Sequence, residues 1–325
     1  MEKEKLLDIK DLSVTYKTED GIVYAVNNLN LTLEPKETLG FVGETGAGKT
    51  TTAMTIMGLL PTPPGKVTSG EIMFDGKDML KIGDKERRGI LGEKISMIFQ
   101  DPMTSLNPVM TVGAQIAEVV LLHNKISKAE ARERAKEMLE QVGIPGSRCD
   151  DYPHQFSGGM KQRVMIAIAL ACSPELLIAD EPTTALDVTI QAQVLELMRN
   201  LKKEYNTSLV LITHDLGVVA KICDKVAVVY AGEIIESGTL KDIYTDKRHP
   251  YTIGLFDSLP DIENDAATLK VIQGSVPDPS NLPEGCKFNP RCPYATEACR
   301  SGDIKPVKIS DTHMVRCNRF SDTEV

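Results

Sequence analysis

One octet, residues 43–50, constrains the fold of this 325-residue chain more than any other segment, because it reads Gly-Glu-Thr-Gly-Ala-Gly-Lys-Thr. This order matches the phosphate-binding P-loop, in which glycines let the backbone turn tightly enough for successive N–H groups to point at phosphate oxygens. An apolar run, 38–42, precedes the octet, and 50–60 reads as a helix, whose positive N-terminal end also attracts an anion. The octet therefore predicts an α/β fold with a strand, a loop and a helix around a nucleotide.

Two side chains of the loop have separate expected tasks. Lys49 is expected to reach the β- and γ-phosphates of ATP, and the Thr50 hydroxyl is expected to bind Mg²⁺. The residues expected to bind the nucleotide are Gly43, Glu44, Thr45, Gly46, Ala47, Gly48, Lys49, Thr50 and Thr51.

A second motif, residues 176–181, is an apolar strand that ends in two acids, Asp180 and Glu181. Asp180 is expected to hold Mg²⁺ through water, as P-loop enzymes require. Glu181 is expected to polarise the attacking water, because partial burial at the end of a strand raises the basicity of a carboxylate. The alternative is a solvated acid pair that caps the next helix, and the P-loop upstream favours the catalytic interpretation.

Hydrophobic periodicity predicts the elements around these motifs. From residue 158 onward helix and strand alternate, which is typical of parallel βα units. The opening third is rich in strands, whereas 101–153 reads as helical and contains a capping box at Ser127 that opens a helix to about Val142. The predicted strands are 7–16, 21–33, 38–42, 71–74, 94–99, 176–179 and 208–213, and the other predicted helices are 159–172 and 188–205.

Composition excludes some classes of function. The net charge of −9 argues against broad nucleic-acid binding, which needs a basic surface. The N-terminus has no apolar stretch of a secretory signal, and no run approaches the roughly 18 apolar residues of a membrane-spanning helix. If the protein works at a membrane, we expect a partner to supply the span.

Four of the seven cysteines crowd into the last 40 residues of the chain: Cys286, Cys292, Cys299 and Cys317. No two of them have the two-residue gap of most zinc fingers. Four thiolates at irregular spacing, with Pro293 after Cys292, are typical of a [4Fe–4S] cluster that would hold the proline-rich tail. Structural Zn²⁺ and free or disulfide-bonded cysteines are the alternatives.

Residues 156–160, Phe-Ser-Gly-Gly-Met, narrow the choice among P-loop proteins. They resemble the signature motif of the ABC family, whose usual form is Leu-Ser-Gly-Gly-Gln, and Met160 is the departure. In that family the motif serves the γ-phosphate of ATP held by the partner subunit, so the resemblance implies a dimer. The residues it assigns to the partner's ATP are Ser157, Gly158, Gly159 and Met160. The other reading is a simple helix cap at Ser157.

Other residues follow in the order that the ABC family shows. Gln100 resembles the Q-loop glutamine, Asp187 the D-loop aspartate and His214 the switch histidine, which contacts the γ-phosphate. Tyr16 resembles the aromatic residue that stacks on adenine, with Tyr24 as a competing candidate. The resemblance thus implies Glu181, His214 and Gln100 as catalytic residues and Thr50, Gln100 and Asp180 as the Mg²⁺ site.

This resemblance covers residues 6 to about 245 and implies a particular architecture. It implies an ABC-type P-loop NTPase with an antiparallel β subdomain, a RecA-like parallel-sheet core, a helical subdomain at about 101–170 and a short Cys-rich C-terminal extension. Prolines multiply and periodicity fades after Asp246. We therefore expect a nucleotide-binding domain at 1–245 and an extension with the four cysteines at 246–325.

Four segments, 100–108, 183–189, 248–252 and 286–293, resemble the branch of ABC ATPases that serves dipeptide, oligopeptide and nickel importers. The resemblance implies MgATP hydrolysis that drives peptide uptake from the cytoplasmic face of the membrane. It also implies a second, homologous ABC ATPase, two transmembrane permease subunits and an extracytoplasmic binding protein as partners, with no nucleic acid.

Alternative functions stay open at this point. The same motor role could serve nickel, a sugar or another small solute, because the ATPase does not touch the cargo. A soluble ABC ATPase of DNA repair, translation or iron–sulfur assembly is a further alternative, although the chain has one cassette and no sustained heptad repeat. A regulatory subunit that binds ATP without turnover is disfavoured by the presence of Glu181.

Overall fold

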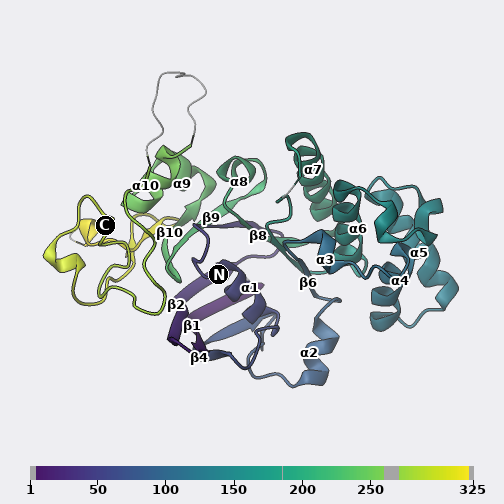
Figure 1. The fold of residues 1–325 in the computed structure, drawn as a ribbon, viewed down its shortest axis with the longest axis horizontal. Coiled ribbons are helices and arrows are strands. Elements are labelled where there is room, and N and C mark those ends of the chain that lie inside the picture. Colours follow the sequence, from purple (N-terminus) through teal and green to yellow (C-terminus); the bar gives the residue numbers. More distant parts are fainter. Residues whose placement is uncertain (1–4, 185, 260–270, 322–325) are drawn as a thin grey trace. The chain divides into compact units, whose positions relative to one another are not determined.

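The computed structural model describes residues 5–184, 186–259 and 271–321 (Figure 1). The chain divides into two compact units, each with its own interior. Unit 1 consists of Met1–Leu6, Leu33–Thr38 and Met79–Thr213, and unit 2 consists of Leu7–Thr32, Leu39–Asp78 and His214–Val325.

Unit 1 contains three parallel strands, β6 (Ile95–Ile98), β7 (Leu176–Asp180) and β8 (Ser208–Thr213). β7 lies in the middle, with Leu176 opposite Ile95 on one side and opposite Ser208 on the other. All positions of the three strands are buried, as in a parallel sheet covered on both faces. The predicted parallel βα arrangement is therefore confirmed.

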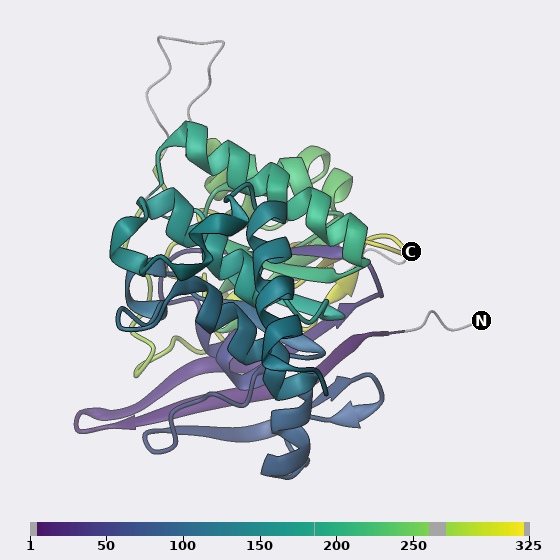
Figure 2. The ribbon, with the colours of Figure 1, turned by 90° about the vertical axis from the view of Figure 1, so that its right-hand side faces the viewer.

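Helices make up most of the rest of unit 1, and Figure 2 shows the helices of residues 112–170 in teal. The helix predicted from the capping box, α5 (Lys128–Gln141), is confirmed at its start. The Ser127 N–H donates to Glu130 Oε2 at 2.7 Å, and the Glu130 N–H donates to Ser127 Oγ at 3.2 Å. The other helices of the unit are α2 (Asp84–Ile90), α3 (Pro102–Ser105), α4 (Val112–His123), η1 (Gly146–Asp150), η2 (Pro153–Gln155), α6 (Gly158–Leu170) and α7 (Val188–Tyr205).

Unit 2 begins with an antiparallel sheet in the strand order β2-β1-β4-β5. Its strands are β1 (Leu7–Thr18), β2 (Gly21–Leu33), β4 (Gly65–Phe74) and β5 (Lys77–Asp78). Alternate apolar residues of β1 are buried, from Leu7 and Ile9 onward, which gives the sheet one apolar face. The pairing of β1 with β4 shifts register between Lys10 and Val14.

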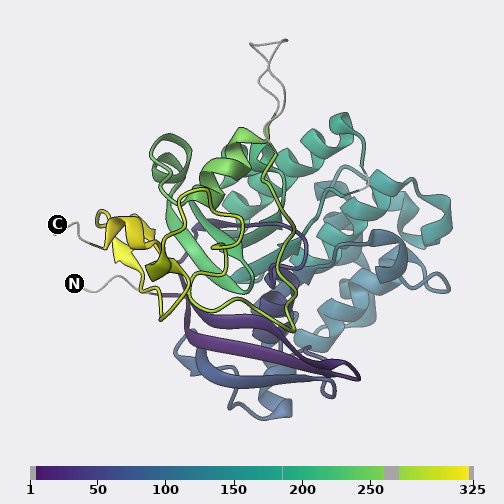
Figure 3. The same cartoon turned by 60° about the vertical axis from the view of Figure 1, so that its left-hand side comes forward.

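A second sheet of unit 2 contains strands in the order β11-β12-β10-β9-β3. β3 (Thr38–Val42) is parallel to β9 (Lys225–Tyr230), and β10 (Glu233–Thr239) is antiparallel to β9. The short tail strands β12 (Met314–Val315) and β11 (Val307–Lys308) extend this sheet beyond β10. Figure 3 shows these yellow strands beside the green ones. The C-terminal segment is thus tied to the unit by main-chain pairing.

Helices of unit 2 follow its strands. They are α1 (Lys49–Ile56), α8 (Leu216–Ile222), α9 (Leu240–Thr245), α10 (Pro250–Asp257), η3 (Glu297–Cys299) and η4 (Asn318–Phe320). α1 ends four residues before the predicted residue 60, because Gly58 adopts a left-handed φ of 63°. The Gly58 N–H donates to Thr55 O, and the Leu59 N–H donates to Met54 O. These two bonds are typical of a helix that ends at a glycine. No helix in the described part of either unit is long and apolar enough to cross a membrane.

Candidate functional site

The P-loop, residues 43–48, connects β3 to α1 in unit 2, as predicted. Two glycines are required by close main-chain contacts. A Cβ atom at Gly43 would lie 2.2 Å from Val229 O, and one at Gly48 would lie 2.2 Å from Ala25 O. Gly48 also has a φ of 94°, which L side chains rarely adopt. The loop is therefore held in one conformation by the strands on which it packs.

Lys49 and Tyr16 both lie at this loop. The Lys49 ammonium is buried and donates to Gly43 O at 2.8 Å and to Glu44 O at 2.9 Å. The Tyr16 hydroxyl donates to Thr51 Oγ1 in the first turn of α1 at 3.3 Å. Thr50 is exposed at the start of the helix. Unit 2 thus brings together the residues predicted for phosphate binding and the predicted adenine-stacking tyrosine.

The predicted acid pair lies at the carboxyl end of β7 in unit 1. Asp180 is the last residue of the strand and is 2% exposed. Glu181 Oε2 accepts hydrogen bonds from Gln100 Nε2 and from Thr184 Oγ1, both at 2.9 Å. The structure therefore brings two predicted catalytic residues into contact. It also adds Thr184, which the sequence analysis missed although it lies in the segment 183–189.

Glu181 has an unusual backbone conformation. Its φ is 46°, in the left-handed region that costs a residue with a side chain roughly 1–2 kcal/mol. The Glu181 N–H donates to Ile212 O at 2.9 Å, which holds the residue at the end of the sheet. Such strain persists where the surrounding structure fixes it, and it is concentrated at functional sites.

The signature segment opens α6 in unit 1. Ser157 is the N-cap residue, and its side chain accepts from the Met160 N–H at 3.4 Å. A Cβ atom at Gly159 would lie 2.6 Å from Ile190 Cγ2 of α7, whereas one at Gly158 would meet nothing within 4 Å. Gly159 thus permits the close packing of two helices, and Gly158 leaves the end of α6 open.

Two further predicted residues lie at the ends of elements. Asp187 caps α7, since its Oδ1 accepts from the N–H groups of Thr189 and Ile190 at 3.1 and 3.0 Å. His214 follows β8 and belongs to unit 2. The predicted motif 183–189 includes Ala185, which lies outside the described residues. The P-loop and the acid pair thus belong to different units, and the D-loop and switch roles stay predictions.

The four tail cysteines are unpaired thiols. Burial, with a smaller contribution from the neighbouring thiols of Cys317, Cys292 and Cys299, raises the pKa of Cys286 to about 11. Burial also raises the pKa values of Cys292 and Cys317. Among all the residues that the structure describes, no group of three or more His, Cys, Asp or Glu side chains could hold a metal ion. The geometry therefore supports neither the predicted [4Fe–4S] cluster nor the alternative Zn²⁺ site.

Residues of the C-terminal part of unit 2 also contact the P-loop, which the sequence analysis did not predict. Arg291 forms an ion pair with Glu44, and the Tyr251 hydroxyl accepts from the Glu44 N–H at 3.0 Å. A signal was present, because both residues lie in the branch segments 248–252 and 286–293.

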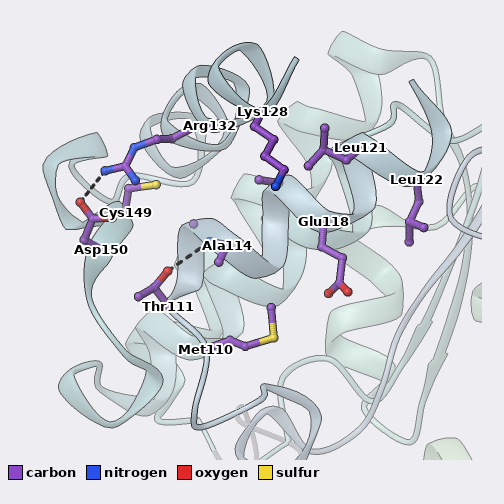
Figure 4. Close-up of a pocket in the computed structure, with 12 residues that line it drawn as sticks. Met110, Thr111, Ala114, Glu118, Leu121, Leu122, Lys128, Arg132, Cys149 and Asp150 are labelled. Carbon is purple, nitrogen blue, oxygen red and sulfur yellow. Dashed lines mark hydrogen bonds and ion pairs between the residues drawn. The ribbon is translucent and has the colours of Figure 1, made fainter. Parts of the chain in front are cut away.

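A separate groove in unit 1 lies between α4, α5 and η1 (Figure 4). Its volume is about 550 Å³, and Met110, Ala114 and Leu121 are among its apolar lining residues. Leu122 at its edge is 73% exposed. An ion pair between Arg132 and Asp150, 2.6 Å long, borders the groove. It contains none of the predicted nucleotide-binding residues.

Comparison with known families supports the reading of both parts of the chain. The family described as "ABC transporter" matches residues 26–184. The family described as "Oligopeptide/dipeptide transporter, C-terminal region" matches residues 235–299.

Similar proteins align over most of the chain. The oligopeptide transport ATP-binding protein OppD of Bacillus subtilis is 53% identical over 315 residues, which are 96% of this chain and 88% of that protein. The dipeptide transport ATP-binding protein DppD of Escherichia coli is 48% identical over 96% of each chain. Among solved structures, a dimeric ATP-binding cassette in a post-hydrolysis state with ADP and phosphate is 30% identical. It covers 72% of this chain and 98% of its own, with a TM-score of 0.65.

Proposed function

The chain belongs to the ABC transporter family of ATPases, and we propose that it is the ATP-hydrolysing subunit of an importer that takes up peptides. The observation that carries the ATPase part is Glu181, a residue with a left-handed backbone after a buried strand, whose carboxylate Gln100 and Thr184 hold in a fixed orientation. The observation that supports peptides is the high identity to oligopeptide and dipeptide transport ATP-binding proteins over nearly the whole chain.

In the proposed mechanism, the P-loop of unit 2 binds the phosphates of ATP through its N–H groups and Lys49. Thr50, Gln100 and, through water, Asp180 would hold Mg²⁺, which neutralises charge on the β- and γ-phosphates when bound. Tyr16 would stack on the adenine.

Glu181 acts on the nucleophile. Gln100 and Thr184 donate to its Oε2 and fix the orientation of the carboxylate, which would accept a hydrogen bond from the attacking water and orient that water toward the γ-phosphorus. His214 would contact the γ-phosphate. We include Thr184 in the site because it shares the orienting role with Gln100.

A second ATPase subunit would complete each site. The open start of α6, at Ser157, Gly158, Gly159 and Met160, would contact the γ-phosphate of ATP held by the partner, and Asp187 would lie at the same interface. The partner is proposed to be a homologous ABC ATPase, so that two sites form between two chains.

The proposed domain boundary lies at about residue 245. Residues 1–245, with a helical subdomain at about 101–170, would form the motor, and 246–325 the peptide-importer extension. The proposed location is the cytoplasmic face of the cell membrane, beside two permease subunits and with an extracytoplasmic binding protein that delivers the peptide.

The groove of unit 1 is the proposed contact for a permease subunit. Its lining combines apolar residues with charged residues of both signs, Lys128, Glu118 and Arg132, and such a lining suits an amphipathic helix from a cytoplasmic loop of the permease. Burial of Leu122 on docking would remove an exposed apolar side chain from water.

The four tail cysteines are proposed as ligands of a [4Fe–4S] cluster, with Zn²⁺ as the alternative. Their support is the sequence spacing. The arrangement of the described residues does not meet the requirement for a metal site. Iron, sulfide and zinc quantitation after anaerobic purification decides the matter: about four irons and four sulfides per chain support the cluster.

The test of the catalytic proposal is Glu181→Gln. The amide keeps the size of the side chain but cannot orient water as a carboxylate does, so ATP hydrolysis should be abolished while ATP binding persists. Hydrolysis is measured in the assembled transporter and binding by nucleotide titration of the purified chain. Unchanged hydrolysis in the variant would remove Glu181 from its proposed role.

A further inference from the structure

The second residue of the P-loop, Glu44, is gripped by the C-terminal part of unit 2. Arg291 Nη1 donates to Glu44 Oε2 at 2.8 Å, and Arg291 Nη2 donates to Oε1 at 3.3 Å. The two bonds form the parallel, bidentate arrangement that makes arginine–carboxylate pairs strong. The Arg291 side chain is 5% exposed and that of Glu44 is 30% exposed, so solvent screens the pair only in part.

Contacts with residues other than Glu44 also hold the Arg291 side chain in place. Its Nε donates to Gln273 O at 3.1 Å, and its Nη1 donates to the Tyr230 hydroxyl at 3.3 Å. The guanidinium also lies 5.9 Å from the centre of the Phe288 ring. A cation held by a carbonyl, a hydroxyl and an aromatic ring is preorganised for one carboxylate position.

The second contact, from Tyr251, is anchored in the same way. Its ring packs against those of Tyr230 and Phe288, with centroids 4.6 and 5.5 Å away. Its N–H donates to His249 Nδ1 at 3.0 Å, and the His249 N–H donates to the buried carboxylate of Glu236 at 2.9 Å. These contacts therefore hold the Tyr251 hydroxyl in place where it accepts from the Glu44 N–H.

These contacts affect the nucleotide site because Glu44 lies beside Lys49. Lys49, which is proposed to bind the phosphates of ATP, donates to the carbonyl oxygen of Glu44 at 2.9 Å. A free carboxylate in this loop would repel the phosphates of ATP or attract the Lys49 ammonium away from them. Arg291 removes both effects by pairing with that carboxylate.

We propose that Arg291 is a positioning residue of the nucleotide site, through which the C-terminal segment neutralises Glu44 and sets the affinity of the P-loop for ATP. The inference rests on the proposed function. It also gives a role to the segments 248–252 and 286–293, which otherwise have none in ATP hydrolysis.

The experiment measures binding of trinitrophenyl-ATP to the purified full chain by fluorescence titration. Arg291→Gln should weaken binding on the order of tenfold, because one partner of a largely buried charge pair is removed and the other stays charged. In a Glu44→Gln background the same Arg291→Gln change should alter affinity less than about twofold, since no carboxylate is left to neutralise. Arg291→Lys, which keeps the charge but loses the fork, should fall between wild type and Arg291→Gln.

Arg300→Gln is the matched control, because Arg300 is an exposed arginine of the same tail and should leave affinity unchanged. Thermal unfolding without nucleotide separates a folding effect from the proposed one. The proposal is overturned if Arg291→Gln binds like wild type, or if it weakens binding equally with and without the Glu44 carboxylate. Lys49→Ala in the same series tests the P-loop itself, so loss of the proposed function would be seen separately.

Discussion

Two adjacent glycines of the signature segment are predicted to respond in opposite ways to the same substitution. A Cβ atom at Gly159 would lie 2.6 Å from Ile190 Cγ2, about 1 Å closer than an ordinary carbon–carbon contact. Cγ2 belongs to a β-branched side chain and cannot swing away freely. Gly159→Ala must therefore push α6 and α7 apart or force Ile190 off its rotamer.

The magnitude follows from two opposing effects. Overpacking by one methyl group costs about 1–3 kcal/mol, and replacing glycine by alanine in a helix returns about 0.5–1 kcal/mol. Gly159→Ala should thus lower the free energy of unfolding by about 1–2 kcal/mol. At Gly158 the added Cβ meets nothing, so Gly158→Ala should be neutral or stabilising by up to about 1 kcal/mol.

Urea unfolding of the purified chain, followed by circular dichroism, measures both variants. Ile190→Ala removes the methyl group that clashes, so Gly159→Ala should cost less in that background by about 1 kcal/mol. Equal stabilities of the Gly158→Ala and Gly159→Ala variants, or no relief from Ile190→Ala, would refute the packing argument.

Three further predictions follow from the site and its surroundings. Lys49→Ala should weaken ATP binding more than tenfold, since a charge-assisted contact to phosphate is lost; wild-type affinity in a nucleotide titration would contradict the P-loop role. Thr184→Ala should slow ATP hydrolysis by the assembled transporter several-fold with ATP affinity retained, because Glu181 loses a hydrogen bond that orients its carboxylate; an unchanged rate would remove Thr184 from the site. Burial lowers the pKa of His249 in the folded chain to about 4. The same side chain has a pKa of about 6.5 in the unfolded chain, so the unfolded chain binds the proton at a higher pH than the folded chain does. The free energy of unfolding therefore falls as the pH drops from about 6.5 toward 4. The resulting loss in the free energy of unfolding between pH 7 and pH 5 is about 2 kcal/mol. His249→Asn keeps a side chain that can cap the helix but does not titrate, so urea unfolding of this variant should depend less on pH. A pH profile identical to that of the wild type would contradict the role of His249 in this pH dependence.

The sequence predicts structure well where the signals are local. The strands at 21–33 and 208–213 and the helix at 188–205 were predicted with the bounds that the structure has. Each is a long periodic segment or follows a clear turn, so neighbours along the chain decide its conformation. The capping box at Ser127 is local in the same sense, since both partners lie within one helical turn.

The tail could not be predicted in this way. Residues after Asp246 have many prolines and little periodicity, and their order comes from partners far along the chain. β12 pairs with β10, and Arg291 pairs with Glu44 across 247 positions of sequence. α10 was missed for the same reason, because its N-cap His249 and its contacts through Tyr251 depend on residues elsewhere in unit 2.

The functional residues also differ in whether the local sequence identifies them. The P-loop and the acid pair each carry their chemistry in a continuous motif, so the sequence identifies them. Contact between Gln100 and Glu181 joins residues 81 positions apart and was implied only by the order of motifs. Thr184 and Arg291 needed the structure, because a hydroxyl or a guanidinium has no functional meaning until its partner is known.

ATP hydrolysis by the reconstituted transporter, with and without peptide-loaded binding protein, tests the central claim most directly. The complex contains this chain, the second ATPase and both permease subunits in lipid vesicles. The account predicts that peptide-loaded binding protein stimulates hydrolysis several-fold, that peptide accumulates inside the vesicles, and that Glu181→Gln abolishes both. Stimulation by a nickel chelate or a sugar but not by peptide would contradict the peptide assignment, and hydrolysis that no binding protein affects would contradict the importer role.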